Sequence, residues 1–266
     1  MRRDRLRVVG TQAVGPYTLV RLGRGRLQPG APGQFFMLEA PGRPLPRPFS
    51  LCTASAGELG FLVEPLGKGT TAIASLDVGD VIHVTGPLGR GFDLDVARPL
   101  LVGGGIGVAP FPFLSERLGA PSALLGFRTA FHAEAAGLVP NATVVLDPVL
   151  VTDALPPDPG DVLACGPEAM LDALARVVPD AQLAREAPMA CGYGACYGCV
   201  VDRDGRYVRL CLEGPVLRGE THGSPTSPLL RAAPRQHGFW APAGQSPAPP
   251  AKEHVSDDAS NSTVAG

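Results

Sequence analysis

The strongest constraint on this chain is a short segment near residue 200 that holds four of its six cysteines. Three of them follow a C-x4-C-x2-C spacing and the last stands after eleven further residues: Cys191, Cys196, Cys199 and Cys211. A plant-type [2Fe–2S] cluster uses this spacing, since three thiolates converge from one tight loop while a fourth arrives from elsewhere. Intervening glycines permit positive φ and let backbone N–H groups face the sulfurs. They are Gly192, Gly194 and Gly198.

Two other uses of these cysteines stay open. Structural zinc also takes four cysteines, but usually as two C-x2-C pairs, and only Cys196 and Cys199 form one here. Disulfides are less expected in a chain of this size that shows no secretory segment. Cys52 and Cys165 lie far from the segment and are expected to be buried apolar thiols.

Length and composition limit the function classes. A chain of 266 residues with 45% apolar and 18% charged residues suits one or two globular domains with appendages. The formal net charge is −2, and apart from four N-terminal arginines there is no basic stripe, which disfavours nucleic acid and anionic membranes. No signal peptide follows those arginines, and the longest uncharged run is too short for a membrane span. We therefore expect a cytoplasmic protein.

Residues 1–95 consist of short apolar stretches separated by Gly and Pro, which predicts a small antiparallel β-barrel. The expected strands are Leu6–Val9, Tyr17–Leu22, Gln34–Glu39, Gly60–Glu64 and Val81–Thr85. A helix is expected at Thr71–Leu76.

Residues 96–184 alternate buried strands with helices, which predicts a parallel α/β domain. The expected strands are Leu100–Val102, Ala123–Phe127, Thr143–Leu146 and Val162–Ala164, and the expected helices are Pro112–Leu118, Ala130–Ala136 and Glu168–Val177. The cysteines occupy a third part, 185–218. Residues 219–266 are rich in Pro, Ser, Gly and Ala, and we expect this tail to be disordered.

The second domain opens with an apolar strand that ends in glycines, Leu100 to Pro110, before a helix begins near Pro110 or Pro112. Such a turn can bring backbone close to a pyrophosphate, although a tight turn without a ligand is an open alternative. In the first domain, Arg47-Pro48-Phe49-Ser50 and Gly67-Lys68-Gly69-Thr70 offer an arginine, a hydroxyl and a glycine-rich helix start. A flavin's ribityl chain and pyrophosphate need these groups.

The order of these motifs resembles the ferredoxin–NAD(P) reductase superfamily. The motifs that carry the resemblance are RPFS, GPLGRGF, GGGIGVAP, CGP, and MACGYGACYGC followed by LCLEGPVL. The cluster loop in particular is similar to the electron-transfer subunits of NAD-dependent (class 1B) dihydroorotate dehydrogenase. The resemblance runs from about residue 5 to residue 218, and it implies a multi-domain β plus α/β fold: an FAD-binding antiparallel barrel, a parallel dinucleotide-binding domain and a small [2Fe–2S] segment.

The resemblance also implies site residues. The FAD contacts would be Arg47, Pro48, Phe49, Ser50, Leu62, Val63, Glu64, Gly69 and Thr70. The residues that face the nicotinamide cofactor would be Gly103, Gly104, Gly105 and Gly107. Cys165, Gly166 and Pro167 would lie on the same side of the domain, near the flavin. The cluster ligands would be Cys191, Cys196, Cys199 and Cys211. No residue is expected to act as a conventional acid or base.

In the family that the chain resembles, a separate FMN-containing catalytic subunit oxidises dihydroorotate in de novo pyrimidine (UMP) biosynthesis. Electrons then pass through the [2Fe–2S] cluster to FAD and on to NAD⁺, in a heterotetramer of two copies of each subunit. The chain would be an oxidoreductase subunit, with the oxidation of dihydroorotate on its partner. The cluster should lie near the surface that meets this partner.

Two departures from the family pattern qualify the resemblance. Relatives commonly have an acidic, Gly/Ser-rich loop before the position of Thr152-Asp153, and this chain is short there. Glu64 stands where relatives usually have arginine, which removes a charge-assisted contact to a flavin pyrophosphate. Two alternatives stay open: a reductase subunit of another flavin and iron–sulfur complex, of hydrogenase or sulfur-reductase type, and a non-enzymatic module that holds zinc. NAD and NADP are not distinguished.

Overall fold

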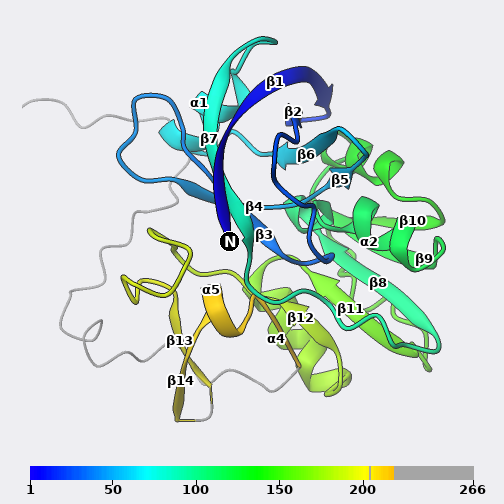
Figure 1. The fold of residues 1–266 in the computed structure, drawn as a ribbon. Helices are drawn as coiled ribbons and strands as arrows, with labels where there is room; N and C mark the ends of the chain where they lie inside the picture. The colour runs from blue at the N-terminus through cyan, green and yellow to red at the C-terminus, as the bar shows by residue number, and fades with distance from the viewer. Residues whose placement is uncertain (204, 219–266) are drawn as a thin grey trace, which may run out of the picture. The chain divides into compact units, whose positions relative to one another are not determined.

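Two sheets and a small cysteine-bearing segment make up residues 1–203 and 205–218, the part of the chain that this computed structural model describes (Figure 1). The predicted disordered tail, 219–266, lies outside the described residues. Among the described helices, none is both long enough and apolar enough to cross a membrane.

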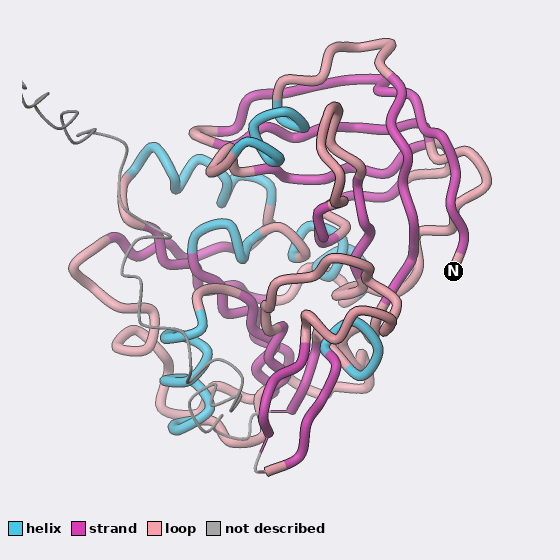
Figure 2. Tube along the Cα trace, turned by 90° about the vertical axis from the view of Figure 1, so that its left-hand side faces the viewer, coloured by secondary structure: helices cyan, strands magenta, loops and turns pink. Residues whose placement is uncertain are grey.

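The first sheet is antiparallel throughout. In spatial order it contains β4 (Arg47–Ser50), β3 (Phe35–Leu38), β7 (Val81–Leu88), β1 (Arg2–Val14), β2 (Tyr17–Gly23), β6 (Glu58–Val63) and β5 (Thr53–Ala54). Strands β4 and β5 are its two edges, yet only Leu51 and Cys52 separate them in sequence. The sheet must therefore curl until its edges approach each other, and Figure 2 shows its strands curving past the N-terminus. The predicted antiparallel barrel is confirmed.

Alternating side chains fill the interior of this barrel. Along β1, Leu6 and Val8 are buried while Arg5 and Arg7 are exposed, because successive side chains of a strand point to opposite faces. In the core, the rings of Phe36 and Phe61 pack edge-on with centroids 5.5 Å apart. The pattern explains why the apolar stretches of residues 1–95 could be recognised as strands.

The helix between β6 and β7 begins earlier than predicted. The sequence predicts Thr71–Leu76, whereas α1 spans Lys68–Ala74. The hydroxyl of Thr70 accepts hydrogen bonds from the N–H groups of Leu66 and Gly67, at 3.0 Å each. This side chain satisfies donors at the start of the helix, so the glycine-rich residues 67–70 belong to its first turn.

The second sheet is parallel except at one edge. Its order is β10 (Ala142–Leu146), β9 (Ser122–Phe127), β8 (Pro99–Gly104), β11 (Asp161–Cys165), β12 (Gln182–Ala184) and β15 (Val216–Arg218). Strand β15, which follows the cysteines, pairs antiparallel with β12. The predicted α/β domain is confirmed, and the chain returns to its sheet after the cysteine segment.

Helices cover both faces of this sheet. They are η1 (Gly105–Val108), α2 (Phe111–Arg117), α3 (Ala130–Ala133), η2 (Glu134–Leu138) and α4 (Glu168–Val177). Leu101 packs in one core with α2, while its neighbour Val102 packs in another with α4. In α4, Leu171, Leu174 and Ala175 are buried at the i, i+3, i+4 spacing of an amphipathic helix. The bounds of α4 are those predicted from the sequence.

The glycine-rich turn after β8 is shaped by close packing. A 3₁₀ turn, η1, separates the strand from α2, which begins at Phe111, between the two prolines where the sequence predicts a helix start. A Cβ added at Gly107 would overlap the carbonyl group of Cys165. One at Gly103 would come within 2.6 Å of the Phe111 ring. These glycines therefore let η1 and α2 lie directly on the ends of β8 and β11.

The cysteine segment folds back onto the barrel. It contains the antiparallel strands β13 (Val200–Arg203) and β14 (Arg206–Arg209) and the one-turn helix α5 (Leu210–Glu213). Its Cys199 and Cys211 share an apolar cluster with Phe35, Met37 and Leu88 of the barrel. The segment is therefore held against β3 and β7, and its strands β13 and β14 lie at the lower left of Figure 1.

Candidate functional site

A cleft of about 230 Å³ lies where the barrel, the α/β sheet and the cysteine segment meet. Its wall comes from all three parts of the described chain. The lining residues are Phe35, Pro48, Phe49, Ser50, Leu62, Glu64, Leu66, Thr70, Ile106, Ala109, Pro110, Cys165, Arg185, Glu186, Ala187, Met189 and Pro215. Many of the residues that the sequence predicts as cofactor contacts are therefore brought together in one place.

The barrel contributes the residues predicted for FAD. Pro48, Phe49 and Ser50 line the cleft from β4, since this edge strand leaves one side uncovered. Thr70 lines it from the first turn of α1. Arg47 is absent from the wall; its Nη1 donates to the carbonyl groups of Leu45 and Pro46, at 2.9 and 3.2 Å.

The three residues predicted to contact FAD at the end of β6 do not all face the cleft, because successive side chains of a strand point to opposite faces. Leu62 and Glu64 line the cleft, whereas Val63 is buried in the barrel core. Gly69 lies beside Arg47, because a Cβ added there would be 2.9 Å from the arginine Nε. The small residue at 69 thus lets the guanidinium lie over the first turn of α1.

The glycine turn and the Cys165-Gly166-Pro167 motif lie side by side. Cys165 pairs with Gly103 in the parallel register of β11 and β8, so both motifs follow carboxyl ends of adjacent strands. Ligands of open α/β sheets bind at this edge. Of these predicted residues only Cys165 lines the cleft; Ile106, within the turn, lines it as well. Gly105 has φ of +54° with no heavy atom close to an added Cβ, so its backbone is open to approach.

Cys165 and Cys52 are buried thiols, as predicted. Burial raises the pKa of Cys165, and the negative charges of Glu186 and Glu168 raise it further. Burial alone raises the pKa of Cys52 to about 12. Both thiols are therefore neutral at physiological pH, and Cys165 contributes a small apolar surface to the cleft.

Two carboxyl groups in the cleft are shifted toward their neutral forms. Burial raises the pKa of Glu64, although His132 and Arg128 act against the shift. Burial also raises the pKa of Glu186, and the charges of Glu168 and Glu64 add to it. The surroundings of the cleft wall therefore favour the protonated, neutral form of each of these two carboxyl groups.

Sequence reasoning missed the wall that follows β12. Arg185, Glu186, Ala187 and Met189 line the cleft because β12 ends beside Cys165, with Ala184 as its register partner. Pro215 joins them because β15 returns to the same edge of the sheet. No local pattern marks these residues, although their position just before the cysteines is a usable signal.

The four predicted ligand cysteines fall into two pairs. The sulfurs of Cys199 and Cys211 lie 3.1 Å apart in a buried position, and the thiol of Cys196 is hydrogen-bonded to Cys191. All are free thiols. Within the described ranges, no three His, Cys, Asp or Glu side chains gather around one point as a single metal ion requires. Two pairs suit a binuclear cluster, because each of its two irons takes two cysteine ligands.

Backbone N–H groups point at these sulfurs. Ala195 donates to Cys191 Sγ at 3.3 Å, Gly198 donates to Cys196 Sγ at 3.5 Å, and Cys211 donates to Cys199 Sγ at 3.5 Å. Such bonds stabilise negative charge on sulfur. The donor set therefore fits a thiolate-bound cluster.

The pKa values of the thiols reflect these contacts. Burial acts to raise the pKa of Cys191, but N–H groups of the loop and the Cys196 thiol lower it to about 7. Burial, together with the neighbouring Cys199, raises the pKa of Cys211 to about 12. A thiolate at Cys211 therefore requires a metal to replace its proton.

Three positive-φ residues shape the loop. Gly192 has φ of +79° and packs on Met37 and Leu88 of the barrel, while Gly194 has φ of +87° and packs on Leu212. Tyr197 has φ of +58°, which is uncommon for a residue with a side chain. These positions turn the loop around its sulfurs.

The cleft and the cysteine segment share part of one wall. Phe35 lines the cleft and also belongs to the apolar cluster that contains Cys199 and Cys211. Ala187 and Met189 line the cleft and pack against that same cluster. The cleft and the buried cysteine pair therefore adjoin one apolar cluster.

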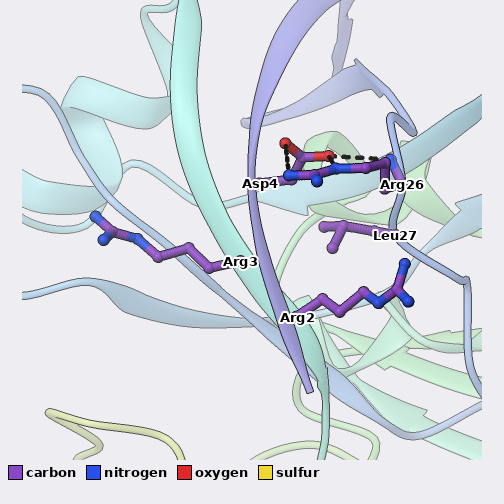
Figure 3. A pocket seen from close by; sticks show the side chains of 5 residues that line it. All are labelled: Arg2, Arg3, Asp4, Arg26 and Leu27. Carbon is purple, nitrogen blue, oxygen red and sulfur yellow. Dashed lines mark hydrogen bonds and ion pairs between the residues drawn. The ribbon is translucent and has the colours of Figure 1, made fainter.

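A second cavity, of about 270 Å³, lies at the start of β1 and holds none of the predicted site residues. Figure 3 shows its lining: Arg2, Arg3, Asp4, Arg26 and Leu27. Asp4 and Arg26 bind each other, and this contact, with other N–H groups, lowers the pKa of Asp4 to about 2. Within this cavity Asp4 is already paired with Arg26, and Arg3 is paired with Glu39 outside it.

Comparison with known proteins gives a consistent result. The family model described as the iron–sulfur cluster binding domain of dihydroorotate dehydrogenase B matches residues 186–221. The electron transfer subunit of dihydroorotate dehydrogenase B (NAD(+)) from Listeria monocytogenes serovar 1/2a is 38% identical over 225 residues, covering 71% of this chain and 86% of the relative. The subunit of the same name from Bacillus caldolyticus is 36% identical over 248 residues, covering 81% and 96%.

Solved structures show the same fold. The NADH-dependent reduced ferredoxin–NADP oxidoreductase aligns with a TM-score of 0.72 and 23% identity, covering 82% of this chain and 89% of that chain. Phthalate dioxygenase reductase aligns with a TM-score of 0.57 and 16% identity, covering 82% and 96%. At these identities the likeness concerns the arrangement of the sheets.

Replacing Cys196 with serine should abolish the cluster and leave the cleft intact. Serine removes one of the four predicted sulfur ligands from an exposed loop position, so the fold should tolerate it. Iron and sulfide should fall below stoichiometry while bound flavin stays at the wild-type level. The matched control is Cys52→Ala, which lies outside the segment and should keep its iron. Full iron content in Cys196→Ser would show that this ligand set is wrong.

The Glu64 carboxyl predicts a pH-dependent stability. Its folded pKa is raised above its ordinary value of 4.5, so the folded state binds the proton more tightly than the unfolded state. Stability is therefore lost as pH rises from 4.5 through the folded pKa. Glu64→Gln should raise the melting temperature at pH 7 and leave it nearly unchanged at pH 4.

The control for this change is Glu116→Gln, at an exposed position of α2. It should shift the melting temperature little at either pH. A Glu64→Gln variant that is destabilised at pH 7 would contradict the buried-carboxyl account.

Proposed function

Because this chain belongs to the family of electron-transfer subunits of NAD-dependent dihydroorotate dehydrogenase B, we propose that it relays electrons from a dihydroorotate-oxidising subunit to NAD⁺. The relay uses a [2Fe–2S] cluster on the cysteine segment and FAD in the cleft. FAD, when bound, supplies the exchange between single electrons and a hydride. The process belongs to de novo pyrimidine (UMP) biosynthesis.

The shared wall is the observation that carries this proposal. Phe35 lines the cleft and belongs to the apolar cluster that contains Cys199 and Cys211, and Ala187 and Met189 line the cleft and pack against that cluster. A relay needs its two centres close together and held at a fixed distance. The apolar packing of the cysteine segment on the barrel supplies both conditions.

The chain's own residues hold and shield the cofactors. Phe49 and Ser50 would bind FAD from the barrel side of the cleft, with apolar contact and a hydroxyl group. Thr70 lines the same side and would contact FAD through its methyl group, because its hydroxyl is engaged at the start of α1. Arg47 lies over the first turn of α1, where a guanidinium can meet a phosphate. Cys165 excludes water from the opposite wall, as a neutral thiol. NAD⁺ would approach over Gly105, where the backbone is open.

The surface around Cys196 is the site we assign to the catalytic subunit, which carries FMN in this proposal. Cys196 is exposed, and three large apolar or aromatic side chains of the cysteine segment are exposed as well. Tyr193 is 51% exposed, Tyr197 is 64% exposed and Leu212 is 40% exposed. Exposed aromatic side chains of this kind are common at protein interfaces. Electrons would then enter through the cluster ligand nearest the partner, in a heterotetramer of two copies of each subunit.

Arg209 holds this surface in place. Its guanidinium lies 5.0 Å from the centroid of the Tyr197 ring, and its Nη1 donates to the carbonyl of Gly194 at 3.2 Å. These contacts restrict Tyr197 before any partner binds, which lowers the entropy lost on association.

The direct test of the proposed function is reconstitution. The chain is purified anaerobically, its iron, sulfide, zinc and FAD are measured, and it is mixed with the dihydroorotate dehydrogenase subunit of the same organism. The mixture should form NADH when dihydroorotate and NAD⁺ are added, and neither protein alone should do so. A full set of cofactors without this coupling would favour a reductase of another flavin and iron–sulfur complex. Stoichiometric zinc without flavin would favour a non-enzymatic module.

Removing both tyrosines should weaken the complex. The double variant Tyr193→Ala/Tyr197→Ala should raise the dissociation constant for the catalytic subunit by roughly ten- to thirty-fold, as expected for central aromatic contacts. The control is Phe131→Ala, an exposed aromatic on α3 that should leave the constant unchanged. Equal binding by the double variant, measured by titration calorimetry with the cluster intact, would move the interface elsewhere.

A further inference from the structure

Arg185 is a buried cation in the wall of the cleft that the proposed function does not use. It follows β12 directly, and its side chain is only 2% exposed. Its Nη1 donates to Glu168 at 2.5 Å and to Asp172 at 2.7 Å, both on α4. Glu168 also accepts from the backbone N–H of Glu186 at 2.9 Å. This network fixes residues 185 and 186 at the edge of the cleft.

The second terminal nitrogen of Arg185 has no partner. Nη2 is buried and makes no hydrogen bond to any described residue, while Nη1 takes both carboxylates. A buried N–H of a charged group without an acceptor is costly, so native proteins rarely leave one. Arg185 lines the cleft, so a small rotation of its guanidinium about the anchored Nη1 would let an occupant of the cleft supply the missing acceptor to the buried Nη2.

We propose that Arg185 is a flavin-contacting residue whose Nη2 donates a hydrogen bond to a ring carbonyl or ring nitrogen of the flavin in the cleft. The inference rests on the proposed function, because it needs FAD in this cleft. A planar guanidinium suits the task, since one nitrogen can be anchored by carboxylates while the other donates to a ligand. Glu168 and Asp172 are then positioning residues for Arg185.

The contact has an electrostatic consequence. Reduction of the flavin adds negative charge to the cleft, whose wall includes Arg185 as a charged donor. The fixed positive charge of Arg185 offsets that charge in a setting of low dielectric constant. Arg185 should therefore make the flavin easier to reduce, and its two half-exposed carboxylate partners should limit the effect.

Arg185→Met tests this assignment. The variant removes the charge and both N–H arms but keeps an apolar side chain of similar length. FAD affinity should fall about tenfold or more, the effect expected for losing a hydrogen bond from a charged group. The flavin midpoint potential, measured by anaerobic spectroelectrochemistry on the full chain, should become more negative. The spectrum of the reduced cluster should stay unchanged.

Two further variants keep the test decisive. Arg185→Lys retains the charge but loses the fork, so FAD affinity should fall while the potential moves less than in Arg185→Met. This comparison also serves if the methionine variant fails to fold. Arg98→Met removes an exposed arginine that is paired with Asp158 outside the cleft, and it should change neither quantity.

The outcomes separate this inference from the proposed function. Unchanged FAD affinity and potential in the folded Arg185 variants would overturn the inference and leave Arg185 as a clamp between β12 and α4. If FAD affinity and the flavin potential stay unchanged while NAD⁺ binding weakens, the acceptor for Nη2 lies on the nicotinamide cofactor, and the assignment is overturned. Wild-type protein without FAD would overturn the proposed function, and the inference with it.

Discussion

The structure depends on the apolar contact between the cysteine segment and strands β3 and β7 of the barrel. Met37, Leu88 and Phe35 pack against Cys199 and Cys211, so two sulfurs are fixed by the core of another part of the chain. The remaining pair, Cys191 and Cys196, stays near the surface. One side of the segment thus faces the cleft and the other faces outward.

The return of the chain to the second sheet completes this arrangement. Strand β15 pairs with β12, which places Pro215 in the cleft wall and Arg185 beside it. The N–H of Arg90 in the barrel domain donates to the carbonyl of Gly214 at 2.5 Å, so the same turn is tied to both parts. Consequently the cleft belongs to no single part of the described chain, and its shape depends on all three.

The sequence predicted the features that depend on residue spacing and on local apolar patterns. The cysteine spacing singled out four residues that the structure arranges as two pairs, and the family resemblance placed Gly103 and Cys165 on one side of the cofactor, where β8 and β11 pair. Arg185 could not be found this way, because its role depends on where β12 ends relative to α4. The start of α1 was missed for a similar reason: the Thr70 side chain, rather than residue preference, begins that helix. The pairing of β15 with β12 could not be predicted either, because a strand of three residues is too short to show a periodic pattern and its partner is distant in sequence.

The central claim is that electrons cross the layer formed by Phe35, Ala187 and Met189 between cluster and flavin. The most direct measurement starts from the chain with its cluster reduced anaerobically and the excess reductant removed. Excess NAD⁺ is then added, and the cluster's electron paramagnetic resonance signal is followed together with NADH absorbance. The account predicts that the signal disappears as NADH forms, with two reduced clusters supplying one electron each through FAD for every NADH beyond that formed by flavin reduced at the outset, and that the signal persists in chain stripped of FAD. A cluster that stays reduced in the FAD-containing chain, or one that reoxidises equally without FAD, would contradict it.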